Sequence, residues 1–222
     1  MKINKTNLLF TKDIDNKSIL IDLENQNYQV MMEWEKPYMK ALVDNLNPCG
    51  DVLEIGFGMG YSADQIQKHN IKTHTIIECD PTVLKKLKAW SKKQKKKVHI
   101  VEGVWQDKLD SLSQFDSIFF DDSPIRDNLD LEETRVASFY YRVFEKHVKK
   151  NARMTWYLST AIYWICHPKT IWTMKEYEIS PPPYCKYFQD KVMYLPLLKF
   201  PYGTESNLRK FTLDKNFIFK EL

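Results

Sequence analysis

The chain has 222 residues, 43% of them hydrophobic, and a formal net charge of +4. This length supports one sizeable core and leaves little room for a second one, so we expect a single domain over residues 1–222. No apolar run approaches the roughly 20 residues that cross a bilayer, and the amino terminus lacks the apolar core of a signal peptide, which predicts a cytoplasmic protein. Cys49, Cys79, Cys166 and Cys185 form no C-x-x-C pair, so the sequence indicates neither a disulfide framework nor a metal site.

The first half of the chain changes its hydrophobic period at a glycine-rich segment. Apolar side chains recur at helical spacing from about residue 30 to 46, and Pro48–Gly50 ends the pattern, which predicts an amphipathic helix. Val52–Ile55 is then a short apolar run followed by glycines. This pattern predicts a buried strand, a tight turn and the start of a helix through Ala63 and Ile66.

The same rhythm of strand and helix continues and then breaks near the carboxyl end. Alternation of this kind predicts a parallel sheet with helices on both faces. Two later strands around Pro181–Pro183 predict an antiparallel addition at the sheet edge. The expected fold class is therefore α/β and Rossmann-like, with a mostly parallel seven-stranded sheet and an antiparallel C-terminal edge. Besides 52–55, the expected strands are 75–78, 98–101, 117–121, 154–158, 173–179 and 193–198, and the later helices run through 84–90 and 132–148.

Three closely spaced glycines follow the first of these strands. Gly56, Gly58 and Gly60 let the backbone turn sharply and approach a ligand, as in dinucleotide-binding folds. Tyr61 stands where the pyrophosphate fingerprint has its third glycine, so that fingerprint is broken. Glu78 ends the next strand, where a carboxylate can accept both hydroxyls of a ribose. A nucleoside without a pyrophosphate fits both facts.

S-adenosylmethionine is such a nucleoside, and the sequence resembles proteins that use it. Glu54–Gly58 has the form E-x-G-x-G, which is similar to motif I of the class I methyltransferases. Trp105 and Gln106 follow the third strand, where an aromatic wall and an amide suit an adenine. The expected cofactor-binding residues in the turn and at the strand ends are Gly56, Phe57, Gly58, Met59, Gly60, Tyr61, Ser62, Glu78, Cys79, Asp80, Trp105 and Gln106.

A more specific resemblance begins at Val30–Met39. This segment looks like the signature helix of guanidinoacetate N-methyltransferases and of the fungal and plant arginine delta-N-methyltransferases. The resemblance covers roughly residues 28 to 200, and it implies a class I methyltransferase that acts on a guanidino group. Further matching segments follow in the same order at 52–60, 76–79, 102–105, 115–121 and 182–187.

The resemblance implies that Glu35 and Asp121 hold the guanidino group. Elementary chemistry agrees, because a sulfonium and a guanidinium repel each other in a site of low dielectric unless carboxylates lie nearby. Carboxylates also match guanidinium geometry bidentately. A guanidinium has no free lone pair and its pKa exceeds about 12, so methylation needs a proton acceptor. Asp121 is the candidate base, and Glu35 would orient the group and offset its charge.

Other roles follow from the same resemblance. It places Met31 and Met39 beside the cofactor, with Met31 also near the acceptor, and it places Ser159 and Thr160 in a loop whose backbone receives the substrate carboxylate. Residues 1–29 would form a lid or extension over the cofactor, ahead of a catalytic core at 30–222. The family's cofactor-covering tryptophan is missing from this amino-terminal segment, and Phe10 is the candidate to replace it.

The chain departs from the family pattern around the acceptor. The family's Tyr-Asp-Thr is Phe120–Asp122 here, its Pro-Gly-Gly turn is Lys150–Ala152, and an insertion near Arg126–Asp130 lengthens one loop. The extra carboxylate of Asp122 could accept a further cation of the substrate or face water. Guanidinoacetate, free arginine, a peptidyl arginine and a guanidino natural-product intermediate therefore stay open as acceptors.

Two rival functions remain. The lysines of segment 85–97 and the faint likeness of Asp121–Pro124 to a base-methylating motif would fit a nucleic-acid methyltransferase, but the aromatic that stacks a flipped base is lacking. Steep salt dependence of nucleic-acid binding would favour that rival. A catalytically silent protein would bind the cofactor and methylate no guanidine. We expect a small guanidino substrate and neither a membrane nor a nucleic-acid partner, and a homodimer stays open.

Overall fold

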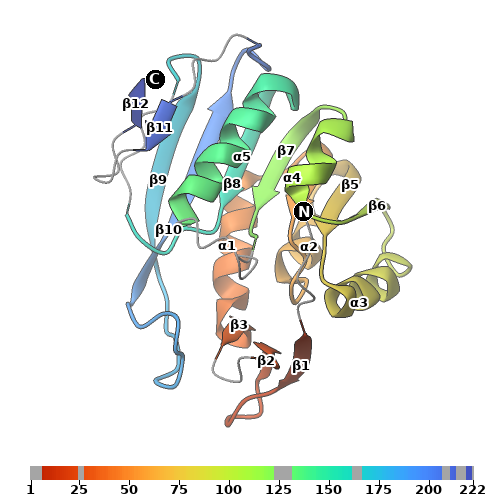
Figure 1. Cartoon of the computed structure of the whole chain (residues 1–222), viewed down its shortest axis with the longest axis vertical. Coiled ribbons are helices and arrows are strands. Elements are labelled where there is room, and N and C mark those ends of the chain that lie inside the picture. The colour runs from red at the N-terminus through yellow and green to blue at the C-terminus, as the bar shows by residue number, and fades with distance from the viewer. Residues whose placement is uncertain are drawn as a thin grey trace.

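The computed structural model describes residues 7–24, 28–122, 132–161 and 167–206, together with the backbone of two short strands near the carboxyl end, β11 (Phe211–Leu213) and β12 (Phe219–Glu221). Its centre is a seven-stranded sheet with the order β6-β5-β4-β7-β8-β10-β9 (Figure 1). The predicted strands are confirmed with shifted bounds. They are β4 (Gly50–Ile55), β5 (Ile71–Glu78), β6 (Lys97–Glu102), β7 (Phe115–Phe120), β8 (Val148–Trp156), β9 (Ile171–Glu178) and β10 (Val192–Phe200). All begin earlier than predicted, and β7, β8 and β9 also end one or two residues earlier, so that Asp121 follows β7 and does not belong to it.

Helices cover both faces of this sheet, as predicted. Successive side chains of a strand point to opposite faces, so Val52 of β4 packs in one core and its neighbour Leu53 in the other. The core around Val52 contains side chains of α1 (Lys36–Leu46), α2 (Tyr61–Ile66) and α3 (Pro81–Ser91). The core around Leu53 contains side chains of α4 (Trp105–Lys108) and α5 (Glu132–Lys146). In Figure 1, α4 and α5 lie in front of the sheet and α1 lies behind it.

Strand directions divide the sheet as the sequence indicates. β6, β5, β4, β7 and β8 pair in parallel, with Val52 opposite Ser117 and His74. β10 runs antiparallel to both β8 and β9, which forms the predicted C-terminal edge. The carboxyl ends of β4, β5, β7 and β8 therefore meet along one edge, where ligands bind in open α/β sheets.

The amino-terminal part differs from the prediction, because the helix expected at residues 30–46 begins later. β1 (Leu8–Lys12), β2 (Ser18–Asp22) and β3 (Gln29–Met32) form a separate antiparallel sheet, in which Met31 and Met32 pair with β2. A 3-10 turn, η1 (Glu33–Glu35), links β3 to α1. The helix begins here because Pro37 lies in its first turn, where a residue without an N–H is tolerated and its fixed φ suits a helix. Within the described residues, no helix is long and apolar enough to cross a membrane.

Candidate active site

The glycine turn after β4 brings two strand ends into close contact. Gly56 has a φ of +79°, and a Cβ built on it would lie 2.1 Å from the carbonyl oxygen of Asp121. The backbone N–H of Asp121 also donates to the carbonyl of Ile55, at 3.0 Å. Gly56 is therefore needed to let the end of β7 lie against the turn, and this contact fixes Asp121 beside the glycines.

Met31 reaches this turn from β3. Gly58 has a φ of +50°, and a Cβ on it would lie 3.0 Å from the sulfur of Met31. The N–H of Met59 points to the same sulfur, at 3.4 Å. The N-terminal sheet thus places a thioether on the glycine turn, and the role of Met31 beside a cofactor stays a prediction. Met39 lies elsewhere, in α1, with 0% of its surface exposed in the core.

Glu78 ties the end of β5 to the glycine turn. Its Oε2 accepts the N–H of Phe57 at 2.9 Å, and its Oε1 accepts the N–H groups of Cys79 and Asp80 at 2.7 and 2.8 Å. Burial raises the pKa of this carboxyl above its ordinary value, against the lowering effect of the three N–H groups. A carboxylate has about four lone-pair positions, so in this conformation one remains for a ligand hydroxyl.

Below the turn lies a buried polar cluster. Ser62 donates to Oε1 of Glu54 at 2.5 Å, and Oε2 of Glu54 lies 2.8 Å from Nε2 of His74. Glu54 and His74 are both 0% exposed. The cluster joins α2 to β4 and β5, so Ser62 supports the turn from below. The sequence reasoning missed His74 because no local pattern pairs it with Glu54.

The other predicted cofactor residues also have contacts and electrostatic surroundings within the protein. Asp80 caps α3, since its Oδ1 accepts the N–H groups of Thr82 and Val83 at 2.8 and 3.0 Å. The ring of Phe57 packs on Trp90, with 5.2 Å between their centroids. Burial and the neighbouring carboxylates raise the pKa of Tyr61 to about 12. Gly60, with a φ of +82°, is the N-cap of α2.

Trp105 is buried beside Asp122. The indole is 5% exposed, and its Nε1 donates to Oδ2 of Asp122 at 2.9 Å. Arg135 donates from Nε to Oδ1 of Asp122 at 3.1 Å. Asp122 is thus paired with Arg135 of this chain. Its carboxylate is therefore neither open to bulk water nor available to a cation of the substrate. The neighbouring Gln106 is exposed, and its carbonyl accepts from Arg142 at 2.8 Å.

Glu35 is a buried carboxylate, and one of its two oxygens accepts hydrogen bonds from the protein. It is 3% exposed, and its Oε1 accepts the N–H of Met32 at 2.8 Å and the hydroxyl of Tyr187. In the part of the chain that the structure describes, Oε2 has no partner. Burial raises the pKa of Glu35 to about 7. A carboxylate of this kind is poised to accept a cation, because a positive group would offset the cost of burying its charge.

Tyr187 is a site residue that sequence reasoning missed. Burial and the adjacent Glu35 carboxylate raise its pKa far above the usual range, so the phenol stays a hydrogen-bond donor. Its ring stacks on Trp34 at 6.1 Å between centroids and 28° between planes. The contact joins residues 152 positions apart, and the only sequence signal was the family-like segment Pro182–Tyr187.

A series of neighbouring residues leads from Glu35 toward the end of β7, which Asp121 follows. The N–H of Tyr157, the residue after β8, donates to the carbonyl of Phe120 at 3.2 Å. Tyr157 also lies close enough to Tyr187 to affect its pKa electrostatically. The chain of neighbours from Glu35 through Tyr187 and Tyr157 therefore ends next to Asp121.

The loop after β8 is anchored by Tyr38. The hydroxyl of Tyr38 accepts the N–H of Leu158 at 3.1 Å and donates to the carbonyl of Tyr194 at 2.8 Å. Ser159 and Thr160 follow directly, half-buried and exposed respectively. The insertion at 126–130 and Cys166 lie outside the described residues.

The lysine segment is mostly a solvated face. Lys86 differs, because its ammonium donates to the carbonyl of Met59 at 2.8 Å and lies 4.3 Å from the ring centroid of Phe10. Phe10 is thereby placed over α3 next to the glycine turn. The exposed members are Lys85, Lys88, Lys92, Lys93, Lys95 and Lys97.

Residues 14–164, more than half of the chain, match the family Guanidinoacetate N-methyltransferase. The chain belongs to this family. Among curated proteins, it is 43% identical over 121 residues to protein arginine N-methyltransferase 2 of Candida glabrata, which covers 52% of this chain and 28% of that protein. The protein of the same name from Saccharomyces cerevisiae is 39% identical over 108 residues, 46% of this chain and 26% of that protein. The matched part thus spans about a quarter of the length of these relatives.

Solved structures support the methyltransferase fold of this family member. A spermidine synthase from Thermotoga maritima has a TM-score of 0.56 at 16% identity, covering 93% of this chain and 75% of that chain. An O-methyltransferase from Bacillus cereus in complex with SAH has a TM-score of 0.54 at 11% identity, covering 77% and 82%. At these identities the likeness shows the fold, and it confirms the predicted Rossmann-like class.

Proposed function

We propose that the chain binds S-adenosylmethionine at the glycine turn and transfers its methyl group to a guanidino nitrogen. One observation carries the proposal: a carboxylate that is 3% exposed, Glu35, has one oxygen held by Met32 and Tyr187 and the other without a partner among the described residues. Contacts through Tyr187 and Tyr157 lead from this carboxylate toward the end of β7, which Asp121 follows. A neutral acceptor would not need such a pair.

The glycine turn fits the proposed cofactor. Gly58 lacks a Cβ, which would lie 3.0 Å from the Met31 sulfur, so the backbone of the turn and this thioether lie in direct contact. Glu78 keeps one lone-pair position for a ribose hydroxyl. Gly58, Met31 and Glu78 would hold the cofactor, and the Bacillus cereus neighbour binds SAH on the same fold. When bound, the cofactor supplies an electrophilic methyl group on a sulfonium.

The carboxylates make the approach of two cations feasible. Two unit charges about 4 Å apart repel by about 4 kcal/mol at an effective dielectric constant of 20. Oε2 of Glu35 would accept a guanidino N–H and offset one of these charges. Tyr187 and Met32 fix the rotamer of Glu35, so the acceptor nitrogen is positioned before the reaction.

The proton balance assigns a role to Asp121. A guanidino nitrogen attacks the methyl carbon, the new C–N bond forms, and the C–S bond breaks with its electron pair going to sulfur. The guanidinium must lose one proton as it gains the methyl group, so the product is a singly charged methylguanidinium. Asp121 would accept that proton as the bond forms. Its position against Gly56 places it beside the turn.

The substrate class is proposed from the relatives. Two curated relatives carry the name protein arginine N-methyltransferase 2, and the family is named for guanidinoacetate. We favour arginine, free or within a polypeptide, because these relatives are named for it, and the departure from the family pattern at Phe120–Asp122 puts guanidinoacetate in doubt.

The test is incubation with methyl-labelled S-adenosylmethionine and separate guanidino compounds, followed by mass spectrometry of the products. The panel contains free arginine, guanidinoacetate and an arginine peptide, with lysine as an amine control. Label on a guanidino nitrogen supports the proposal. Cofactor binding without label on any guanidine would select the catalytically silent alternative, and label on lysine alone would refute the guanidine assignment.

A further inference from the structure

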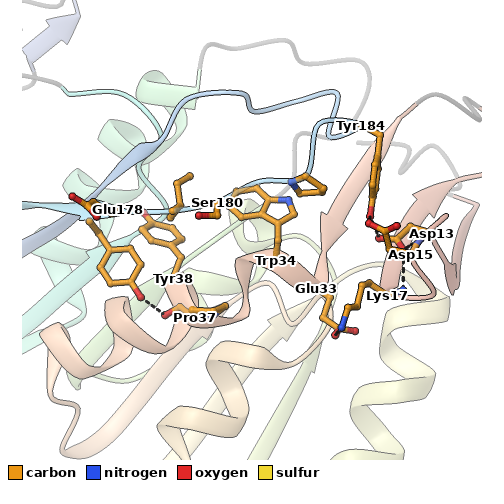
Figure 2. Close-up of a pocket in the computed structure, with 13 residues that line it drawn as sticks. Asp13, Asp15, Lys17, Glu33, Trp34, Pro37, Tyr38, Glu178, Ser180 and Tyr184 are labelled. Atoms are coloured by element: carbon orange, nitrogen blue, oxygen red, sulfur yellow. Dashed lines mark hydrogen bonds and ion pairs between the residues drawn. The ribbon is translucent and has the colours of Figure 1, made fainter.

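A cavity lies beside Trp34, whose ring also stacks on Tyr187 of the acceptor region. Its volume is about 550 Å³, which is within the range of ligand pockets. The β1–β2 turn, η1, the start of α1 and the segment after β9 line it. In Figure 2, Trp34 lies in the middle, with Glu178 on one side and Tyr184, Asp13 and Asp15 on the other.

The cavity is acidic on a basic chain. Asp13, Asp15, Glu33 and Glu178 line it against one cation, Lys17, although the whole chain carries a formal charge of +4. Lys17 lies 3.8 Å from Glu33. Among the described residues, no cation pairs with Glu178. The local excess of carboxylates favours a positively charged occupant.

The walls have the composition that recognises cations. Trp34, Tyr177 and Tyr184 line the cavity with partly exposed aromatic side chains, whereas Tyr38, which also borders it, is fully buried. Aromatic faces attract ammonium and guanidinium groups, and carboxylates at the rim add charge-assisted hydrogen bonds. The hydroxyl of Tyr184 donates to Oδ2 of Asp15 at 2.8 Å, which holds one aromatic side chain and one carboxylate together.

A buried donor in the wall indicates an occupant that also brings an acceptor. Nε1 of Trp34 is buried and has no hydrogen-bond partner among the described residues, whereas buried donors are usually satisfied. A lone cation offers no acceptor. A peptide carries carbonyl oxygens beside its basic side chains, so a peptide fits both features.

Trp34 also connects the cavity to the acceptor. Its ring stacks on Tyr187, whose hydroxyl donates to Glu35. Glu33 lines the cavity and Glu35 lies two residues on, so their Cα atoms are at most about 7.6 Å apart. An extended peptide advances about 3.3–3.6 Å per residue, and a basic residue about two to four positions from a methylated arginine would span this separation.

We infer that this cavity binds a lysine or arginine side chain of a peptide substrate, a few residues from the arginine that is methylated. The inference depends on the proposed function for its substrate, but the cavity itself can be tested by binding alone. It makes a basic neighbour, together with the target guanidine, a determinant of substrate choice.

The test measures binding of blocked peptides to the protein loaded with S-adenosylhomocysteine, so that no turnover is needed. One peptide has a central arginine flanked two positions away by lysines, and its partner has norleucine in their place. We expect the lysine peptide to bind about tenfold more tightly. Glu178→Gln should weaken the lysine peptide about two- to fivefold, and Asp15→Asn with Glu178→Gln about tenfold, with differences that shrink at high salt.

A matched control and a double-mutant cycle separate the outcomes. Glu176→Gln removes a carboxylate of the same strand that does not line the cavity, and it should leave the preference for lysine intact. The norleucine peptide should be insensitive to Glu178→Gln. Equal affinities for the lysine and norleucine peptides would overturn the inference even if guanidines are methylated. So would equal losses of affinity for the lysine peptide in Glu178→Gln and in the control Glu176→Gln. A preserved preference for the lysine peptide without any methylation of guanidines would instead refute the proposed function and support the cavity as a binding site for a basic side chain.

Discussion

Replacing Glu35 by glutamine should stabilise the folded protein and weaken its binding of the acceptor. Burial raises the pKa of Glu35 from its ordinary 4.5 to about 7, which corresponds to about 3 kcal/mol. Between these values the folded protein keeps a proton that the unfolded chain has released, so stability falls as pH rises through this window and the cost is complete above about pH 7. The amide oxygen of glutamine can still accept from Met32 and Tyr187, so Glu35→Gln removes the cost of the buried charge and keeps both hydrogen bonds.

The assay is urea or thermal unfolding of parent and Glu35→Gln at pH 5 and pH 8, without substrate. Part of the destabilisation by the buried charge is already present at pH 5. The difference in the free energy of unfolding between Glu35→Gln and the parent should therefore grow by about 2 kcal/mol between the two pH values. For a chain of this length that is about 4–8 °C in Tm. A variant that is no more stable than the parent at pH 8, or whose advantage does not change with pH, would show that the buried charge of Glu35 does not destabilise the folded protein.

Glu33→Gln is the matched control, two residues away. A backbone hydrogen bond from Ser18 lowers the pKa of Glu33, so its charge stabilises the fold above the usual carboxyl range and the sign is reversed. Glu33→Gln should lose stability at pH 8 relative to the parent, with a smaller loss as pH falls. If both Glu35→Gln and Glu33→Gln were more stable than the parent at pH 8, the cause would be a general effect of removing negative charge.

Three further substitutions test the binding geometry. Gly58→Val places a side chain at a φ of +50° and against the Met31 sulfur, so calorimetry should detect no cofactor binding while circular dichroism stays native-like; normal binding would make the turn purely structural. Glu78→Ala removes the one remaining position for a ribose hydroxyl and should weaken S-adenosylmethionine binding by roughly 1.5–3 kcal/mol, and unchanged affinity would contradict the ribose assignment. Tyr187→Phe removes a hydrogen bond that lowers the pKa of Glu35. The acidic limb of the pH profile of kcat/KM should therefore move above about pH 7, and the KM for the acceptor should rise about three- to tenfold. An unchanged pH profile would show that Tyr187 does not act on Glu35 in the reaction.

The architecture follows from local sequence signals. Short apolar strands and helices of period 3.6 alternate strongly enough to predict the sheet and both helical layers, because each element buries a continuous stripe or face. The start of α1 was mispredicted, since Met31 and Met32 are apolar both at helical spacing and on a strand, and periodicity cannot distinguish the two over so few residues. Pairing with β2, 12 or so residues earlier, decided the outcome.

The candidate site was predicted where its chemistry is local and missed where it is not. Glu35 and the glycine turn stand in recognisable segments, whereas the hydrogen bond from Tyr187 to Glu35 closes over 152 residues. Asp122 shows the same limit, because its partner Arg135 comes from α5 and only the fold brings them together. A sequence pattern indicates which groups are available, and long-range packing decides which are already paired.

The most direct test of the account is the turnover of Asp121→Asn on whichever guanidino compound accepts the label in the parent. Asparagine keeps the shape and removes the base, so single-turnover methylation should fall by about 10²–10⁴ while cofactor affinity changes little. Glu35→Gln should mainly weaken acceptor binding, by roughly 1.5–3 kcal/mol, and the two losses should not add because both carboxylates hold one planar group. Parent-like rates in both variants, or an acceptor that proves to be a neutral amine, hydroxyl or base, would contradict the guanidine assignment.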